Sequence, residues 1–124
     1  MIERAGMPVA YCSWARLSPQ AEMRYMIDPS TLRAEDWNSG DRLWFIDWVA
    51  PFAARDSWRL RRVLAERFPN ELARAIRVKR DRDTARVMQF KGRAMPATEA
   101  RDKFSGYYAE FFRALRKQGC PEPI

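Results

Sequence analysis

Histidine is absent from this sequence of 124 residues, and cysteine and glycine are scarce, with two and five copies. Without histidine the chain cannot build a Ser/His or Cys/His nucleophilic pair, or a histidine-ligated zinc site. It also lacks the side chain best suited to proton transfer near neutral pH. Any catalysis must therefore use carboxylates, tyrosine, lysine, cysteine or backbone groups.

The scarce residues exclude several further classes of site. Cys12 and Cys120 have neither metal-ligand spacing nor the density of a disulfide framework, so we expect plain thiols and no metal centre. The five glycines are scattered and form neither a P-loop nor a dinucleotide-binding fingerprint. Nucleotide chemistry is therefore not expected.

Long hydrophobic runs are also missing. The longest apolar stretch, Leu43 to Phe52, contains Asp47 and is far shorter than the roughly 20 residues that cross a bilayer. Met1 is followed by Glu3 and Arg4 instead of a secretory hydrophobic segment. These features predict a cytoplasmic protein with no membrane span.

Positive charge is abundant, with 23 Lys plus Arg against 16 Asp plus Glu and a net charge of +7. Such a balance favours anionic partners, whether nucleic acid, acidic protein or phosphate-bearing ligand. Genomic base composition explains an arginine excess equally well. Because no zinc-finger, RNA-recognition or basic-zipper pattern is present, nucleic-acid binding is expected only as general electrostatic attraction.

The hydrophobic pattern predicts one α/β domain over residues 1–118, followed by a tail over 119–124. Turn and cap residues separate its elements. The expected strands are Met7–Leu17 and Arg42–Phe52, the expected helices are Pro19–Met26, Asp56 or Ser57 to Phe68, and Ala97–Lys117, and a hairpin of Arg74–Lys79 and Ala85–Phe90 turns at Arg80–Asp83. This order implies helices packed on a sheet in two or three layers.

Asp47 is the first candidate for chemistry, because it lies between Ile46 and Trp48 in an otherwise apolar strand. A lone ionised carboxylate is costly in such a setting unless it is paired or protonated. One interpretation is structural, with Asp47 paired to an arginine such as Arg77. The other is a general acid or base.

Tryptophans and arginines suggest two surfaces. In one interpretation, a channel for a long acyl chain is lined by the tryptophans Trp14, Trp44, Trp48 and Trp58. In the other, these tryptophans fill the core. Arg59, Arg61, Arg62 and Arg67 on the middle helix either receive an acidic partner or form a solvated face.

Five segments of the chain are distinctive as words: PVAYCSWARLS at Pro8–Ser18, EDWNSGDRLWFIDWVAPF at Glu35–Phe52, RFPNELARAIRV at Arg67–Val78, FKG at Phe90–Gly92, and Tyr107-x-x-Glu110. Together they resemble the toxin-activating lysine acyltransferases of the hemolysin-activator type. The resemblance covers nearly the whole chain, and its central block is long and specific.

The resemblance implies a GNAT-like mixed sheet flanked by helices, and a cytoplasmic enzyme that forms homodimers. Such an enzyme moves a fatty acyl group from acyl carrier protein to internal lysines of an RTX protoxin, with no cofactor beyond that donor. It places the catalytic aspartate on Asp47 and substrate-binding roles on Arg77, Tyr107 and Trp48. The segment Ala50–Ser57 lacks the GNAT pyrophosphate loop, as a carrier-protein donor would allow.

The chain departs from the family in one respect. The family's catalytic histidine precedes the strand that corresponds to Met7–Leu17, and this chain begins just before that strand. The resemblance therefore implies a domain that lacks its N-terminal elements and half of the catalytic pair. The alternative is a basic module without chemistry that binds an acidic protein or nucleic acid.

Overall fold

In the computed structural model, which describes residues 1–78 and 85–117, one five-stranded mixed sheet lies between helices. The strands are β1 (Ile2–Arg4), β2 (Met7–Leu17), β3 (Arg42–Val49), β4 (Leu72–Val78) and β5 (Ala85–Lys91), in that spatial order. The helices are α1 (Pro19–Ile27), α2 (Ala54–Arg67) and α3 (Ala97–Lys117), with short 3₁₀ turns η1 (Pro29–Thr31) and η2 (Ala34–Trp37). Among the neighbouring pairs of these five strands, β3–β4 is parallel and the other three are antiparallel.

The predicted α/β class is confirmed, and the mixed sheet is consistent with the GNAT-like fold that the resemblance implied. The order of strands and helices also matches the prediction from Met7 onward. β1 and the two 3₁₀ turns were not predicted. The expected turn at Arg80–Asp83 and the tail over 119–124 lie outside the described residues.

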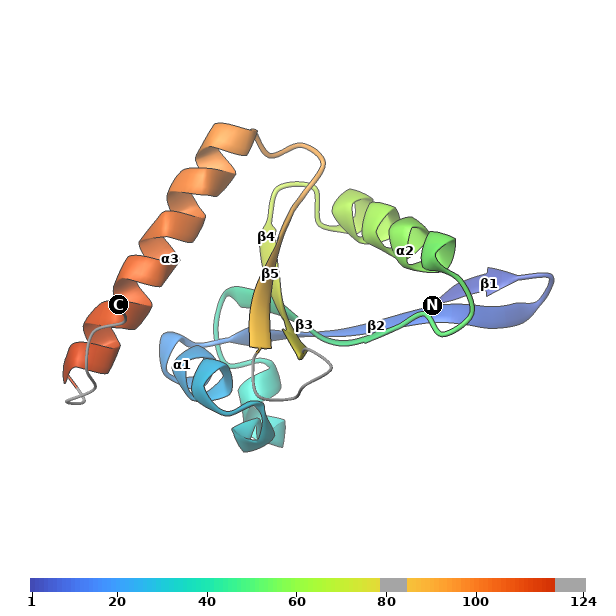
Figure 1. Ribbon diagram of the computed structural model, residues 1–124. Coiled ribbons are helices and arrows are strands. Elements are labelled where there is room, and N and C mark those ends of the chain that lie inside the picture. Colours follow the sequence, from blue (N-terminus) through green and yellow to red (C-terminus); the bar gives the residue numbers. More distant parts are fainter. Residues whose placement is uncertain (79–84, 118–124) are drawn as a thin grey trace.

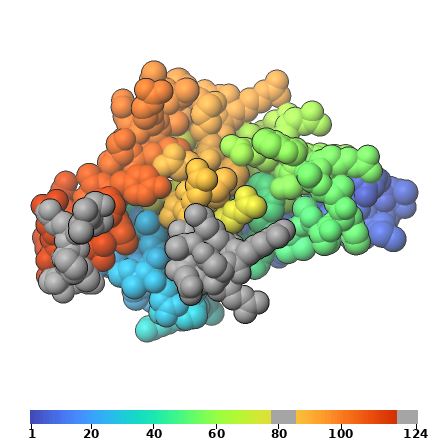
Figure 2. Space-filling view, viewed as in Figure 1, coloured from blue at the N-terminus to red at the C-terminus, as the bar shows by residue number. Residues whose placement is uncertain are grey.

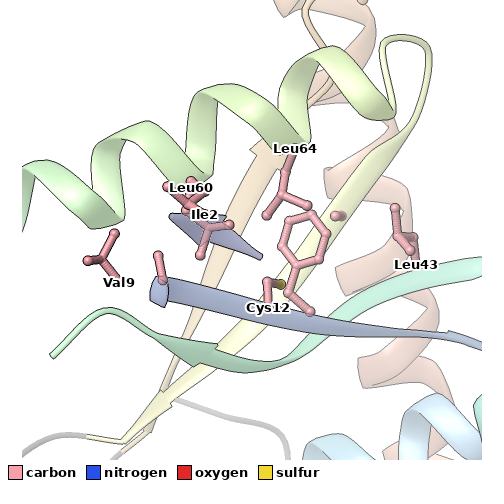
Figure 3. Packing of buried hydrophobic residues seen from close by; sticks show 9 residues of the cluster. Ile2, Val9, Cys12, Leu43, Leu60 and Leu64 are labelled. Carbon is pink, nitrogen blue, oxygen red and sulfur yellow. The ribbon is translucent and has the colours of Figure 1, made fainter. Parts of the chain in front are cut away.

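Helix α2 covers one face of the sheet (Figure 1). Its buried residues Leu60 and Leu64 pack on Ile2, Cys12 and Phe45 of the strands. Figure 3 shows this cluster, with Ile2 and Cys12 lying beneath the helix. Burial of these apolar side chains is the main force that holds the helix to the sheet.

Helix α2 begins earlier than predicted, at Ala54 instead of after Asp56 or Ser57. The expected start was wrong because Asp56 lies within the first turn of the helix, where its side chain bonds to a residue of β1: Arg4 Nη1 donates to Asp56 Oδ1 at 2.8 Å. This ion pair joins the end of β1 to the first turn of α2. A partner so distant in sequence could not be inferred from local pattern.

The opposite face carries α1 and α3. Tyr25 of α1 packs edge-on against Trp44, which is completely buried, with ring centroids 5.3 Å apart. Helix α3 is anchored by Met95, Ala100 and Phe104 next to Leu72. The fold therefore has three layers, with α2 alone on one side.

Gly92 lies where the chain leaves β5 and crosses the end of α2. Its N–H donates to the Glu71 carbonyl at 2.8 Å, and a Cβ there would lie 2.1 Å from the Phe68 carbonyl oxygen. Since the contact is with backbone, a side chain cannot be accommodated by a rotamer change.

We therefore expect Gly92→Ala to lower the free energy of unfolding by about 2–3 kcal/mol, as overpacking does. Gly106→Ala on α3, where nothing lies within 4 Å, is the matched control. It should be neutral or stabilise by up to about 1 kcal/mol, through helix propensity. Urea denaturation measures both, and equal midpoints for the two variants would contradict the close approach.

Candidate active site

Strands β3 and β4 part in the middle of the sheet. Their parallel pairing joins Leu43–Phe45 to Ala73–Ala75, yet β3 continues to Val49 and β4 to Val78. Beyond Phe45 and Ala75 the two strands have no ladder bonds to each other. The sheet is therefore open between β3 and β4.

A cleft of about 550 Å³ lies at this opening, between the parted strands, β5 and α2. That volume falls within the range of about 300–1,000 Å³ that is typical of small-molecule sites. Figure 2 shows α2 in green beside the yellow and orange surface of β4 and β5. Its apolar walls include Trp48, Trp58, Ile76, Met88 and Phe90, and its cations are Arg61 and Arg77.

Trp48 is held rigidly in the wall of this cleft. Its Nε1 donates to Ser57 Oγ of α2 at 2.9 Å, and its ring stacks on Phe90 with centroids 5.3 Å apart. Trp44 is buried in the core, and Trp14 packs edge-on against Phe68. The expected four-tryptophan channel is thus reduced to Trp48 and Trp58.

A β-bulge in β3 decides where Asp47 points. Ser13 is opposite Asp47, and Trp14 is opposite Phe45, so Ile46 is an extra residue on β3. Because successive strand residues point to opposite faces, an uninterrupted strand would put Asp47 on the α2 face with Phe45. The bulge reverses this order, so Trp48 faces α2 and Asp47 faces the other side.

Asp47 is exposed and bonds to Ser13. Ser13 Oγ donates to Asp47 Oδ2 at 2.7 Å and accepts from the Asp47 backbone N–H at 3.0 Å. The proposed structural pairing of Asp47 with Arg77 is wrong, because within residues 1–78 and 85–117 no ion pair involves this carboxylate. Arg77 instead lies on the cleft side of β4.

Ser13 is therefore a positioning residue for Asp47. We expect Ser13→Ala to accelerate hydrogen exchange of the Asp47 amide and to lower any reaction that depends on this carboxylate by about tenfold, the loss of one hydrogen bond to a charged group. Ser13→Thr, which keeps the hydroxyl, should restore both. An amide at Asp47 that exchanges equally in all three proteins would contradict this role.

Tyr107 lies apart from the cleft. Its ring is covered by Arg42 and Arg74, whose guanidinium carbons are 4.7 and 4.6 Å from the ring centroid. Arg74 is buried and also stacks on Trp44 at 4.6 Å. A substrate-binding role for Tyr107 stays a prediction, whereas its contacts tie α3 to the sheet.

The charges around Tyr107 converge on Glu22 of α1. Its carboxylate accepts from Trp44 Nε1 at 2.9 Å, from Arg42 Nη1 at 2.7 Å and from Arg74 Nη2. Arg42 also donates to Glu110 of α3 at 2.9 Å. Burial lowers the pKa of Arg74 to about 10, which leaves it charged at neutral pH.

The nucleophile candidates are limited by burial. Cys12 is buried under α2, and burial, with a smaller contribution from the Asp47 charge, raises the pKa of its thiol to about 12. At neutral pH the thiol is protonated and unreactive.

Among the described residues no cluster of three or more metal-ligating side chains occurs, and none of the helices is long and apolar enough to span a bilayer.

The sheet is open and mixed, with an aromatic cleft on one face and an exposed carboxylate on the other, and this α/β architecture is consistent with a GNAT-like fold. The sequence profile of the RTX toxin acyltransferase family matches residues 1–91. The chain belongs to this family.

Three relatives show the extent of the similarity. A protein-lysine palmitoyltransferase, CyaC, of Bordetella bronchiseptica is 50% identical over 110 residues, covering 89% of this chain and 60% of the relative. A protein-lysine myristoyltransferase, RtxC, of Kingella kingae is 44% identical over 118 residues, or 95% and 70% of the two chains. A protein-lysine myristoyltransferase, HlyC, of Escherichia coli is 42% identical over 118 residues, or 95% and 68%.

Proposed function

We propose that this chain takes part in protein-lysine acyl transfer, moving a fatty acyl group from acyl carrier protein to internal lysines of an RTX protoxin. The relatives' names describe lysine palmitoyl- and myristoyltransferases and RTX toxin activators. The observation that carries the proposal is the position of Asp47. Its carboxylate lies opposite the cleft, next to the point where β3 and β4 part.

The cleft suits a long acyl chain because most of its walls are apolar and aromatic. The inner edges of β3 and β4 beyond Phe45 and Ala75 offer backbone N–H and C=O groups to a pantetheine arm. The acyl thioester would then lie in the opening of the sheet. The acceptor lysine would approach from the Asp47 side.

The reaction requires a neutral lysine amine. Its ammonium gives up a proton, and the amine attacks the thioester carbonyl, so that a C–N bond forms and the C–S bond breaks. The pantetheine sulfur leaves with a proton as a thiol. Asp47 either accepts the lysine proton itself or orients the base that does, and Ser13 keeps its carboxylate in place.

Two arrangements of arginine on α2 support a carrier-protein donor. Arg55, Arg59 and Arg62 are exposed around Trp58, whose exposed fraction is 68%, whereas Arg61 lies over the Phe90 ring in the cleft. Arginine and tryptophan are the residues most enriched at binding hot spots. This outer face of α2 would meet the acidic surface of the carrier protein beside the mouth of the cleft.

Reversing two of these charges tests the docking surface. We expect Arg59→Glu with Arg62→Glu to weaken carrier-protein binding by about tenfold or more and to reduce its dependence on salt, since rim charges act mainly on association. Arg101→Glu with Arg113→Glu on the exposed side of α3 makes the same change in net charge. Titration by fluorescence anisotropy compares them, and equal affinities would exclude this face of α2.

The proposed function is tested by incubating the protein with palmitoyl-loaded carrier protein and a protoxin fragment, then locating modified lysines by mass spectrometry. Because the sequence has no histidine, the assay is run with and without added imidazole, which supplies the missing kind of base. Acylation in either condition supports the proposal if it exceeds that of the same mixture without the protein. A failure to modify lysine in both contradicts it.

A basic module without chemistry is the second candidate, and the net charge of +7 favours it. It predicts salt-sensitive binding to an acidic protein or to duplex nucleic acid with no lysine modification under any condition.

A homodimer, also implied by the resemblance, would be supported by the exposed apolar residues Met7, Tyr11, Val49 and Phe52. Sedimentation analysis distinguishes monomer from dimer. Cytoplasmic location remains part of the same proposal.

A further inference from the structure

Two arginines face each other across the hairpin of β4 and β5. Arg77 and Arg86 are direct partners in the antiparallel register, and both are exposed. Like charges in this position destabilise a sheet, because the two Cβ atoms are only about 5 Å apart. Within the described part of the chain, neither arginine forms an ion pair with a carboxylate.

Both arginines lie on the side of the hairpin that carries the cleft. The preceding register pair, Ala75 and Met88, lines the cleft, and side chains two residues further along each strand project from the same face. A second hollow of about 640 Å³ at the edge of β5 includes Arg86 and shares Met88 with the cleft. Arg86 thus lines a hollow that adjoins the cleft at Met88.

A third arginine approaches from α2. Arg61 lines the same cleft as Arg77, and its guanidinium carbon is 4.9 Å from the Phe90 ring centroid and 5.7 Å from that of Trp58. Stacking on two aromatic rings orders the guanidinium without neutralising it. Two cations, Arg61 and Arg77, therefore line an otherwise apolar cleft, and Arg86 lies beside Arg77 on the neighbouring strand.

We propose that Arg61, Arg77 and Arg86 form a binding site for a phosphate ester that is joined to an acyl thioester arm. Arginine binds phosphate oxygens through paired, charge-assisted hydrogen bonds, and a bound phosphate removes the repulsion between Arg77 and Arg86. The apolar walls take the acyl chain while the arginines hold the phosphate. This inference rests on the proposed function, because it specifies the donor of the acyl group.

The phosphate found on such an arm has two sources, the prosthetic group of a carrier protein and coenzyme A. The shared chemistry is tested with octanoyl-phosphopantetheine and with octanoyl-pantetheine, which lacks the phosphate. Quenching of tryptophan fluorescence reports binding, because Trp48 and Trp58 line the cleft. The unmodified chain should bind the phosphorylated probe about tenfold more tightly, as expected for charge-assisted bonds.

The arginine variants locate the effect. Arg77→Gln and Arg86→Gln should each remove most of the preference for the phosphorylated probe, whereas Arg101→Gln, an equal change in charge at an exposed site on α3, should keep it. Thermal melting verifies that each variant is folded. Equal affinity of the unmodified chain for the two probes overturns the proposal, as does an equal loss in Arg101→Gln.

Competition then identifies the source. Displacement of the probe by acyl carrier protein at lower concentration than by octanoyl-coenzyme A assigns the site to the prosthetic arm, and the reverse order assigns it to the coenzyme. Either order supports the phosphate site. If phosphate-dependent binding is found but no lysine is ever acylated, the proposed function fails while the binding site stands.

Discussion

Asp47→Asn should reduce the rate of lysine acylation by at least about a hundredfold, the lower end of what a positioned acid or base contributes. The substitution keeps the shape of the side chain, and Asn can still accept the hydrogen bond from Ser13 Oγ. It removes only the negative charge and the ability to take a proton. Since Asp47 is exposed, the free energy of unfolding should change by less than about 0.5 kcal/mol.

Asp41→Asn is the matched control, because Asp41 lies just before the same strand with a side chain that is 93% exposed. It makes the same chemical change outside the site and should leave the rate unaltered. Both variants are assayed with palmitoyl-loaded carrier protein and with imidazole present or absent. Equal rates for the two variants would remove Asp47 from the mechanism.

Glu22→Gln should lower the free energy of unfolding by about 3 kcal/mol or more, as expected when one partner of a buried ion pair is lost. Glu22 is 5% exposed and is the only carboxylate among the described residues that contacts both Arg42 and Arg74. Its neutral amide would leave the buried Arg74 without a counter-charge. The carboxamide can replace the hydrogen bond to Trp44 but not the charge.

Glu110→Gln serves as the comparison, because Glu110 binds the same Arg42 but has a side chain that is 44% exposed. A partly solvated pair contributes little, so we expect a loss of less than about 1 kcal/mol. Chemical denaturation at neutral pH measures both variants. Similar denaturation midpoints for the two variants would show that Glu22 does not contribute more than Glu110 to the stability of the protein.

The secondary structure could be predicted largely from local pattern. The apolar run of Met7–Leu17, the Ser18-Pro19 helix start and the helical spacing of Phe104, Tyr107 and Phe111 all correspond to elements in the structure. Ser18 Oγ does accept from the Ala21 N–H at 3.1 Å. These features depend on residues that are close in sequence, so the sequence alone was sufficient to predict them.

Long-range contacts could not be predicted in the same way. Asp47 was identified as a candidate, but its bond to Ser13 follows from strand register, which no local pattern specifies. That Arg77 and Arg86 lie opposite each other is known only from the β4–β5 register. Tyr107 was expected near substrate, whereas its position depends on how α3 packs against Arg42 and Arg74.

The extra residue at Ile46 limits which deletions β3 can tolerate in evolution. Losing a single codon there would turn Asp47 toward α2 and rotate the Trp48 indole out of its stack on Phe90. One deletion would thus abolish both halves of the proposed chemistry while leaving the composition of the strand nearly the same. The proposed activity consequently depends as much on the spacing between Phe45 and Asp47 as on the identity of the carboxylate.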